Sequence, residues 1–218
     1  EPPAPVGDAP GAPELIGAQG GDSVAYFGFI PPVDVGSSPI TGYEVTSGGA
    51  WETVVLAVGR SAGKGCRVTR VPCGLLYGTL TGLTPETTLD LQVRAVNDVG
   101  AGPASNTVSV SVYGKPSAPT ALVVVGSAGS LSFTFGAPVT TGGVALTAYE
   151  YSTDLGVTWL PYEGTIAGST VTVTGLRNGT TYEVWVRALN EFGAGPVAQG
   201  SALVSCRGPL RPGSAQRC

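Results

Sequence analysis

The sequence predicts an all-β protein that contains two tandem two-sheet sandwiches, and three observations support this fold class. First, residues 81–105 and 174–198 repeat one pattern at a spacing of 93 positions. A repeat at about domain length indicates two copies of one folded unit. Second, short segments of alternating apolar and polar residues recur in both copies. Third, the 34 glycines and 18 prolines of the 218 residues lie between those segments, where turns are expected.

The predicted strands fall at matching places in the two copies. They are residues 23–30 and 87–96 in the first copy, and residues 130–136 and 180–189 in the second. Within the last segment, the even positions from Tyr182 share one face and the odd positions from Glu183 share the other. No helical period is found, so each copy is predicted to be a sandwich of short strands.

The domain boundaries follow from the repeat and from local composition. The Pro-rich residues 1–10 are expected to form an extended leader. Module 1 is predicted at residues 11–114, module 2 at 115–204 and a tail at 205–218. The spacing between matching residues falls from 106 to 93 along the chain, so module 1 carries a net insertion of 13 residues at about residues 50–78.

Several motifs together resemble the fibronectin type III module, an immunoglobulin-like β-sandwich, over nearly the whole chain. The motifs are the paired Pro-x-Ala-Pro openings at residues 10–13 and 116–119, the run ITGYEV at 40–45, and the repeated segments 82–102 and 175–195. The run YEYSTDLGVTW at residues 149–159 is similar to bacterial copies of this module. The resemblance therefore implies a tandem pair in a bacterial-type secreted or surface protein.

The same resemblance assigns folding roles to single residues. Tyr182 matches the tyrosine of the family's corner motif, whose hydroxyl ties a strand to the preceding loop. Module 1 has Leu89 at that position and should lack the hydrogen bond. Core roles are implied for Leu83, Leu176, Phe29 and Phe135, the last two standing where the family usually has tryptophan. Positive φ angles are expected at Gly100, Gly102, Gly193 and Gly195.

The four cysteines form two close pairs in the sequence, Cys66 with Cys73 and Cys206 with Cys218. Four cysteines allow three pairings, of which the short spacings favour these two local ones. The second pair would close a disulfide-stapled C-terminal tail. Disulfides indicate an oxidising compartment, and a chain without Met that starts at Glu1 is typical of a processed product. The expected localisation is extracellular or at the cell surface.

The side-chain inventory argues against catalysis. The chain has no histidine, which excludes Ser–His–Asp and Cys–His devices. The carboxylates are scattered, and Asp98 and Glu191 follow predicted strands as turn residues. No enzyme activity, cofactor or metal site is expected. No run of 18 apolar residues occurs, so no membrane span is expected either.

Charged residues make up 12% of the chain and the mean hydropathy is +0.24, which predicts a largely uncharged surface. The low surface charge has two explanations. Either it is the ordinary composition of a Gly- and Ala-rich secreted protein, or neighbouring copies of the chain cover much of the surface. Basic residues concentrate in the insertion and the tail, where they either aid solubility or bind acidic surface of a subunit or an anionic polymer. They are Arg60, Lys64, Arg67, Arg70, Arg207, Arg211 and Arg217. The net charge of −4 does not favour nucleic acid.

Two further features have both a structural and a functional interpretation. Trp51, Trp159 and Trp185 either pack on the sheets or stack on sugars, and Trp185 lies on the outward face of its predicted strand. Asn178 begins a glycosylation sequon, but Asn-Gly also favours a tight turn.

The favoured function is a structural subunit of an extracellular assembly, such as a filament, sheath or surface layer, in which copies of the chain bind one another. The leader or the exposed edge strands would provide these contacts by strand addition. One alternative is a spacer or accessory pair of a secreted polysaccharide-acting enzyme. The other is an adhesin-type module that binds a polysaccharide or a cell-surface protein through the 50–78 insertion.

Overall fold

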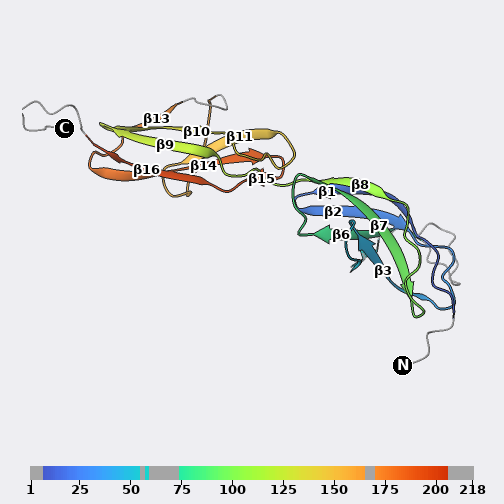
Figure 1. Cartoon of the computed structure of the whole chain (residues 1–218). Coiled ribbons are helices and arrows are strands. Elements are labelled where there is room, and N and C mark those ends of the chain that lie inside the picture. The colour runs from blue at the N-terminus through green and yellow to red at the C-terminus, as the bar shows by residue number, and fades with distance from the viewer. Residues whose placement is uncertain (1–6, 55–56, 59–73, 165–169, 206–218) are drawn as a thin grey trace, which may run out of the picture. The chain divides into compact units, whose positions relative to one another are not determined.

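The computed structural model describes residues 7–54, 57–58, 74–164 and 170–205. The chain divides into two compact units, Glu1–Tyr113 and Gly114–Cys218, which are called module 1 and module 2 below. Every regular element in the described ranges is a β-strand, as Figure 1 shows. The described residues contain no helix with the length and apolarity that a membrane span requires.

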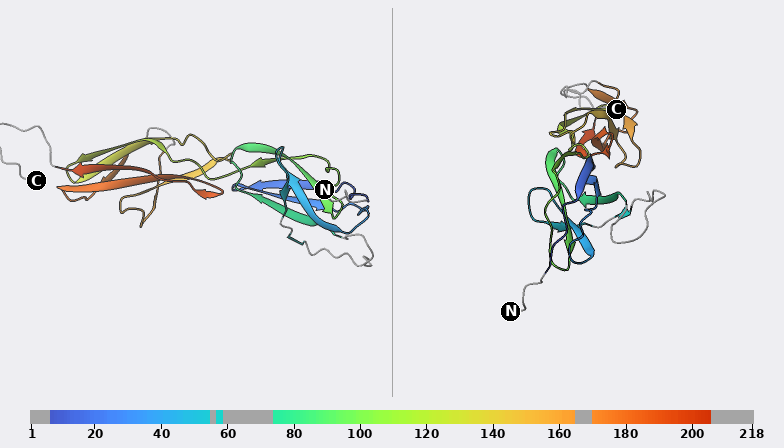
Figure 2. Two further views of the ribbon diagram at one scale, coloured as in Figure 1. Left: turned by 60° about the horizontal axis from the view of Figure 1, so that its bottom comes forward. Right: turned by 90° about the vertical axis from the view of Figure 1, so that its right-hand side faces the viewer.

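Module 1 has two antiparallel sheets, and its strands lie in two layers in Figure 1 and Figure 2. The first sheet has the order β1 (Glu14–Gly21), β2 (Val24–Ile30), β6 (Leu76–Thr81), β5 (Ala57–Val58). The second has the order β4 (Glu52–Thr53), β3 (Ile40–Thr46), β7 (Thr87–Asn97), β8 (Val108–Val112). β5 belongs to the predicted insertion and extends the first sheet beyond β6.

Module 2 repeats this topology. One sheet has the order β13 (Val171–Thr174), β10 (Ser130–Gly136), β9 (Thr120–Ser127). The other has the order β12 (Leu160–Pro161), β11 (Leu146–Ser152), β14 (Thr180–Asn190), β15 (Gly193–Ala194), with β16 (Ala198–Val204) also paired to β14. The registers match as well, because Tyr26 pairs with Thr79 as Ser132 pairs with Thr172.

Period-two alternation builds each core. β7 and β14 have the same burial pattern, in which Leu91, Val93 and Ala95 point inward in module 1. Phe29 and Phe135 lie in the two cores, and Leu83 and Leu176 pack at the core margins. Burial of such side chains is the main favourable term in folding a domain of this size.

Tyr43 gives the core of module 1 a dependence on alkaline pH. Its ring packs at 4.8 Å from that of Phe29, and burial raises the pKa of its hydroxyl from 10.0 to about 12. Because the folded pKa is the higher one, this stabilisation is complete below about pH 10 and is lost as the pH rises from about 10 to 12. Module 1 is expected to lose roughly 2–3 kcal/mol over that range. Urea denaturation should show a smaller alkaline loss for Tyr43→Phe, and an equal loss would contradict the assignment.

The corner hydrogen bond occurs in module 2, where the backbone amide of Arg177 donates to the Tyr182 hydroxyl at 3.0 Å. Leu89, the matching residue of module 1, packs against the core instead. Tyr182→Phe is therefore expected to destabilise module 2 by about 1 kcal/mol, and Leu89→Tyr to stabilise module 1 by a similar amount. Thermal unfolding of both variants tests this pair. A destabilised Leu89→Tyr would mean that module 1 has no room for the ring.

Two of the four glycines expected at positive φ have another role. Gly100 and Gly193 do have positive φ, but Gly102 and Gly195 do not. A Cβ at Gly102 would overlap the carbonyl oxygen of Pro10, and one at Gly195 would overlap that of Pro116. Glycine is needed at these two positions because the chain that enters each module crosses here at close range.

An asparagine at the end of β7 and of β14 ties three segments of each module together. Asn97 Nδ2 donates to the carbonyls of Asp8 and Val35, both at 3.1 Å, and its Oδ1 accepts from Val99 N at 2.9 Å. Asn190 Nδ2 donates to Gly114 O at 2.7 Å and Thr141 O at 2.9 Å. Its Oδ1 accepts from Phe192 N at 2.9 Å. Both side chains are buried, so each amide replaces water for several backbone groups.

The described part of the leader is bound to its own module. Asp8 N donates to Ser37 Oγ at 2.8 Å, and Ser37 N donates to Asp8 O at 3.0 Å. Gly11 N donates to Asp34 O at 2.9 Å, and Pro10 is buried. The backbone of Asp8 and the buried Pro10 are therefore not available for strand addition to a neighbour.

Candidate functional site

The outer face of β1, β2 and β6 in module 1 exposes four large apolar or aromatic side chains. Ile16 is 50% exposed, Tyr26 53%, Ile30 45% and Tyr77 43%. Tyr26 and Ile30 alternate along β2 with the buried Phe27 and Phe29. These four residues, together with Gly28, are called the tyrosine face below.

Gly28 forms the floor of the tyrosine face. It pairs directly with Tyr77, and a Cβ at Gly28 would lie 3.3 Å from Cε1 of Tyr77 and 3.6 Å from Cγ1 of Ile16. The Tyr77 ring therefore lies over β2, beside Ile16. Tyr26 lies two residues before Gly28 on the same face. A Cβ added at Gly21 would lie 3.5 Å from Cε2 of Tyr26. The two rings thus cover neighbouring parts of one sheet face.

The large residues of this face are specific to module 1. β2 and β6 contain no Asp, Glu, Lys or Arg, and the exposed Glu14 of β1, which pairs with Ile30, places one carboxylate at the margin of the face. At matching positions of module 2, Ser132 replaces Tyr26, Gly136 replaces Ile30 and Thr170 replaces Tyr77. Because the fold forms in module 2 with small residues at these positions, the large ones in module 1 are not needed for the sandwich itself.

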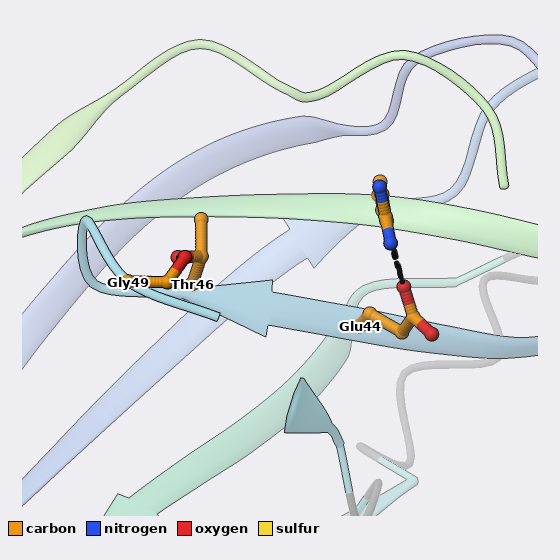
Figure 3. Close-up of polar contacts among 4 residues, drawn as sticks. Glu44, Thr46 and Gly49 are labelled. Atoms are coloured by element: carbon orange, nitrogen blue, oxygen red, sulfur yellow. Dashed lines mark hydrogen bonds and ion pairs between the residues drawn. The ribbon is translucent and has the colours of Figure 1, made fainter. Parts of the chain in front are cut away.

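A second surface feature recurs in both modules, on the sheets that contain β3 and β11. The Arg94 guanidinium lies 4.3 Å from the Trp51 ring centroid and forms an ion pair of 2.6 Å with Glu44. Figure 3 shows Glu44 on β3 with this ion pair drawn as a dashed line, and Thr46, whose hydroxyl donates to the carbonyl of Gly49 at 3.0 Å. Each such Trp–Arg contact contributes about 0.5–1 kcal/mol at an exposed site.

In module 2 the corresponding stack contains Trp159, Arg187 and Glu150. Arg187 Cζ lies 3.7 Å from the Trp159 ring centroid, and Nε of Arg187 donates to Glu150 at 2.8 Å. The half-buried Trp185 lies beside this stack. Its indole N–H donates to Glu183 at 3.1 Å, and its ring is 3.0 Å from the Cβ position of Gly156.

The loop between β11 and β12 is held by Asp154. Its carboxylate accepts from Thr158 N at 2.8 Å and from the Ser152 hydroxyl at 2.7 Å. The hydrogen bond from the Thr158 amide, and next that from Ser152, hold the pKa of Asp154 below its ordinary value. This loop brings Gly156 and Trp159 over the sheet. The observed contacts of Trp51, Trp159 and Trp185 therefore favour packing roles over a sugar-stacking platform.

The other residues that the sequence singled out lie either in exposed turns or outside the described residues. Asp98 and Glu191 are exposed turn residues, and Asn178 Oδ1 accepts from Gly129 N at 2.8 Å. No group of Cys, Asp or Glu that could hold a metal ion occurs in the described ranges. The predicted disulfides and basic clusters lie outside the described residues. These are Arg60, Lys64, Cys66, Arg67, Arg70, Cys73, Cys206, Arg207, Arg211, Arg217 and Cys218.

Sequence reasoning did not single out the tyrosine face. The signal was present in residues 23–30, SVAYFGFI, which include β2. In this segment the inward-facing and the outward-facing positions are both apolar. A strand with one solvent-exposed face normally alternates apolar and polar residues. Apolar residues on both faces therefore predict that the outer face packs against another surface.

Two antiparallel β-sandwiches in one chain define a protein built from tandem modules. The model of the fibronectin type III domain matches residues 8–111 and 117–202, so the chain belongs to the fibronectin type III family. Domains of this family are typically structural or binding modules rather than enzymes.

The chain is also similar to Protein sax-3 from Caenorhabditis elegans. The identity is 34% over 98 residues, and the alignment covers 43% of this chain and 8% of that protein. A bacterial-type origin therefore finds no support in this comparison.

Two solved structures are similar at lower identity. A crystal structure of domains from titin has a TM-score of 0.41 and 20% identity, and the match covers 87% of this chain and 61% of that one. The FN1-FN3 domains of chicken CNTN1 give a TM-score of 0.43 and 16% identity, covering 91% and 66%. Both scores are too low to transfer a function, so the family assignment rests on the family model.

Proposed function

We propose that this chain is a non-catalytic protein-interaction unit of an extracellular or cell-surface protein, and that it binds through the tyrosine face. The single observation that supports this most is the exposure of Ile16, Tyr26, Ile30 and Tyr77, between 43% and 53%, on one sheet face whose strands β2 and β6 carry no charged residue. Tyrosines in such a setting are typical binding anchors because they bury much area at low entropic cost.

The extracellular setting is part of the proposal. It is supported by the two close cysteine pairs of the sequence and by the family, whose tandem modules suit surface proteins. An adhesin-type role through the tyrosine face differs from the predicted role of the 50–78 insertion. β5 nevertheless places the start of that insertion beside β6, at the edge of the same sheet.

Beads coated with the full chain test the proposal. Wild-type beads are expected to adhere to one another or to a cell layer, whereas beads coated with the double variant Tyr26→Ser/Tyr77→Thr are not. This variant copies Ser132 and Thr170 of module 2, so the fold should tolerate it. The matched control is Val123→Thr/Val125→Ser, which changes two residues of 55% and 53% exposure on the outer face of β9. Adhesion that survives the tyrosine substitutions would overturn the proposal.

A structural subunit of an assembly is the second candidate function. It is favoured by the presence of the tyrosine face and of a Pro-rich segment in each chain, since two unlike contacts per copy propagate head to tail. Light scattering over a concentration series tests it, and a mass that stays monomeric at high concentration contradicts it. Binding of the wild type to chitin or cellulose that is lost in Tyr26→Ser would instead assign the face to a polysaccharide.

A further inference from the structure

We infer that the tyrosine face of one copy binds the Pro-rich segment at residues 1–6, EPPAPV, of a second copy. The inference rests on the proposed function, because it requires that the tyrosine face is a binding surface. It adds the identity of the segment that binds this face. Three properties of residues 1–6 support the assignment, namely their composition, their hydrogen-bonding groups and the distance that they can span.

The composition of the segment matches the face. Residues 2–6 carry no charge, and neither do β2 and β6. Proline-rich segments with the P-x-x-P pattern bind surfaces lined with aromatic rings, because they favour a polyproline II helix before binding and lose little entropy. Pro2 and Pro5 have this spacing, and three residues per turn place them on one side of such a helix. Tyr26 and Tyr77 provide two aromatic rings on one sheet face.

Hydrogen-bonding capacity argues for the face of the sheet rather than its edge. Prolines at positions 2, 3 and 5 have no amide hydrogen, so the segment is a poor partner for strand addition. The edge of β1 is moreover occupied at Leu15. Asn106 Oδ1 accepts from Leu15 N at 2.9 Å, and Asn106 Nδ2 donates to Leu15 O at 2.8 Å. On the face, the tyrosine hydroxyls can donate to the backbone carbonyls that a polyproline helix leaves exposed.

Reach assigns the segment to a second copy. A Cβ at Gly7 would lie 2.9 Å from the Ser37 side chain and 3.2 Å from Val99, next to β3 and β7 of the opposite sheet. A path to the tyrosine face of the same module must cross the sandwich, about 10 Å between sheets. It must then run from Ile30 to Tyr26, about 13 Å along β2. At about 3.1 Å per residue, Pro5 reaches about 6 Å from Gly7 and Pro2 about 16 Å. Neither proline can then lie across both tyrosines of its own module.

A peptide titration tests the contact directly. The receiver is the full chain without residues 1–6, a deletion that keeps the contacts of Gly7 and Asp8 with module 1. The probe is a fluorescent peptide of residues 1–8. The peptide is expected to bind, and Tyr26→Ser or Tyr77→Thr in the receiver should weaken binding at least about tenfold, as loss of an aromatic anchor does. A peptide with alanine at positions 2, 3 and 5 should bind as weakly, and Val123→Thr/Val125→Ser should bind as the parent does.

Sedimentation of the intact protein supplies the second readout. The average mass of the wild type should rise with concentration, and deletion of residues 1–6 should abolish that rise. No binding of the peptide, equal binding to the tyrosine variants, or self-association that survives the deletion would each overturn the inference. If the peptide fails while the tyrosine substitutions still abolish bead adhesion, the proposed function stands and only the occupant is wrong. If both fail, the tyrosine face is not a binding surface.

Discussion

Asn190→Asp is expected to destabilise module 2 by roughly 3 kcal/mol at neutral pH, because the carboxylate leaves two carbonyls without a donor, that of Gly114 in a buried hydrogen bond and that of Thr141 in a part-buried one. The native amide donates to Gly114 O and Thr141 O and accepts from Phe192 N. Aspartate keeps only the accepting role and adds a charge next to two carbonyl oxygens. Urea denaturation, with hydrogen exchange to assign each transition to a module, measures the effect.

The pH dependence of this variant gives an independent readout. A protonated acid can donate one of the two lost hydrogen bonds, and burial beside two carbonyl oxygens raises the folded-state pKa of the new acid above its ordinary value. The destabilisation should therefore shrink as the pH falls from neutral toward about 4, and stay constant below that. Asn178→Asp is the matched control, since Asn178 is exposed and its Oδ1 accepts from Gly129 N, a role that a carboxylate can fill. Equal stability of Asn190→Asp and Asn178→Asp would show that Asn190 does not join these segments.

Gly20→Ala is expected to destabilise module 1 by roughly 3 kcal/mol or more, because the new Cβ has no room. On the present backbone that Cβ would overlap the carbonyl oxygen of Ser111 in β8 and lie 2.8 Å from its carbonyl carbon. Both obstacles are backbone atoms, so the strands themselves must separate. Module 2 has the same close approach between Gly126 and Leu203. Thermal unfolding of the full chain should show one module melting at a much lower temperature.

The control for this substitution lies in the same strand. A Cβ at Gly17 meets no atom within 4 Å, and its φ is not among the positive ones. Gly17→Ala should therefore be neutral or stabilise slightly, by up to about 1 kcal/mol, because alanine has less freedom in the unfolded chain. Comparable losses for Gly20→Ala and Gly17→Ala would mean that strand propensity, rather than the approach of β8, sets the cost.

Periodicity predicted the strands well where one face is buried. The predicted segment 130–136 coincides with β10, and the predicted segments 87–96 and 180–189 fall one residue short of the ends of β7 and β14. The missing residues are Asn97 and Asn190. Their recurrence in the repeat was visible, but their hydrogen bonds join segments far apart in the chain, which a local pattern does not reveal.

The glycines show the same limit. Gly100 and Gly193 have the expected positive φ, whereas Gly102 and Gly195 are required by close backbone approach. Both reasons lead to a glycine in the sequence, and only coordinates separate them. The tyrosine face is a further example, since the apolar outward residues of β2 became a surface feature only when β6 placed Tyr77 against Gly28.

The sequence by itself determined the fold class, the repeat of two modules and the family resemblance, because turn chemistry, period-two alternation and recurring motif residues are all local properties of the chain. The tertiary structure alone decided which exposed residues form one surface, which asparagines join distant loops, and which leader residues are bound to module 1. Those features depend on pairing between strands up to about a domain length apart in sequence, and strand pairing is non-local.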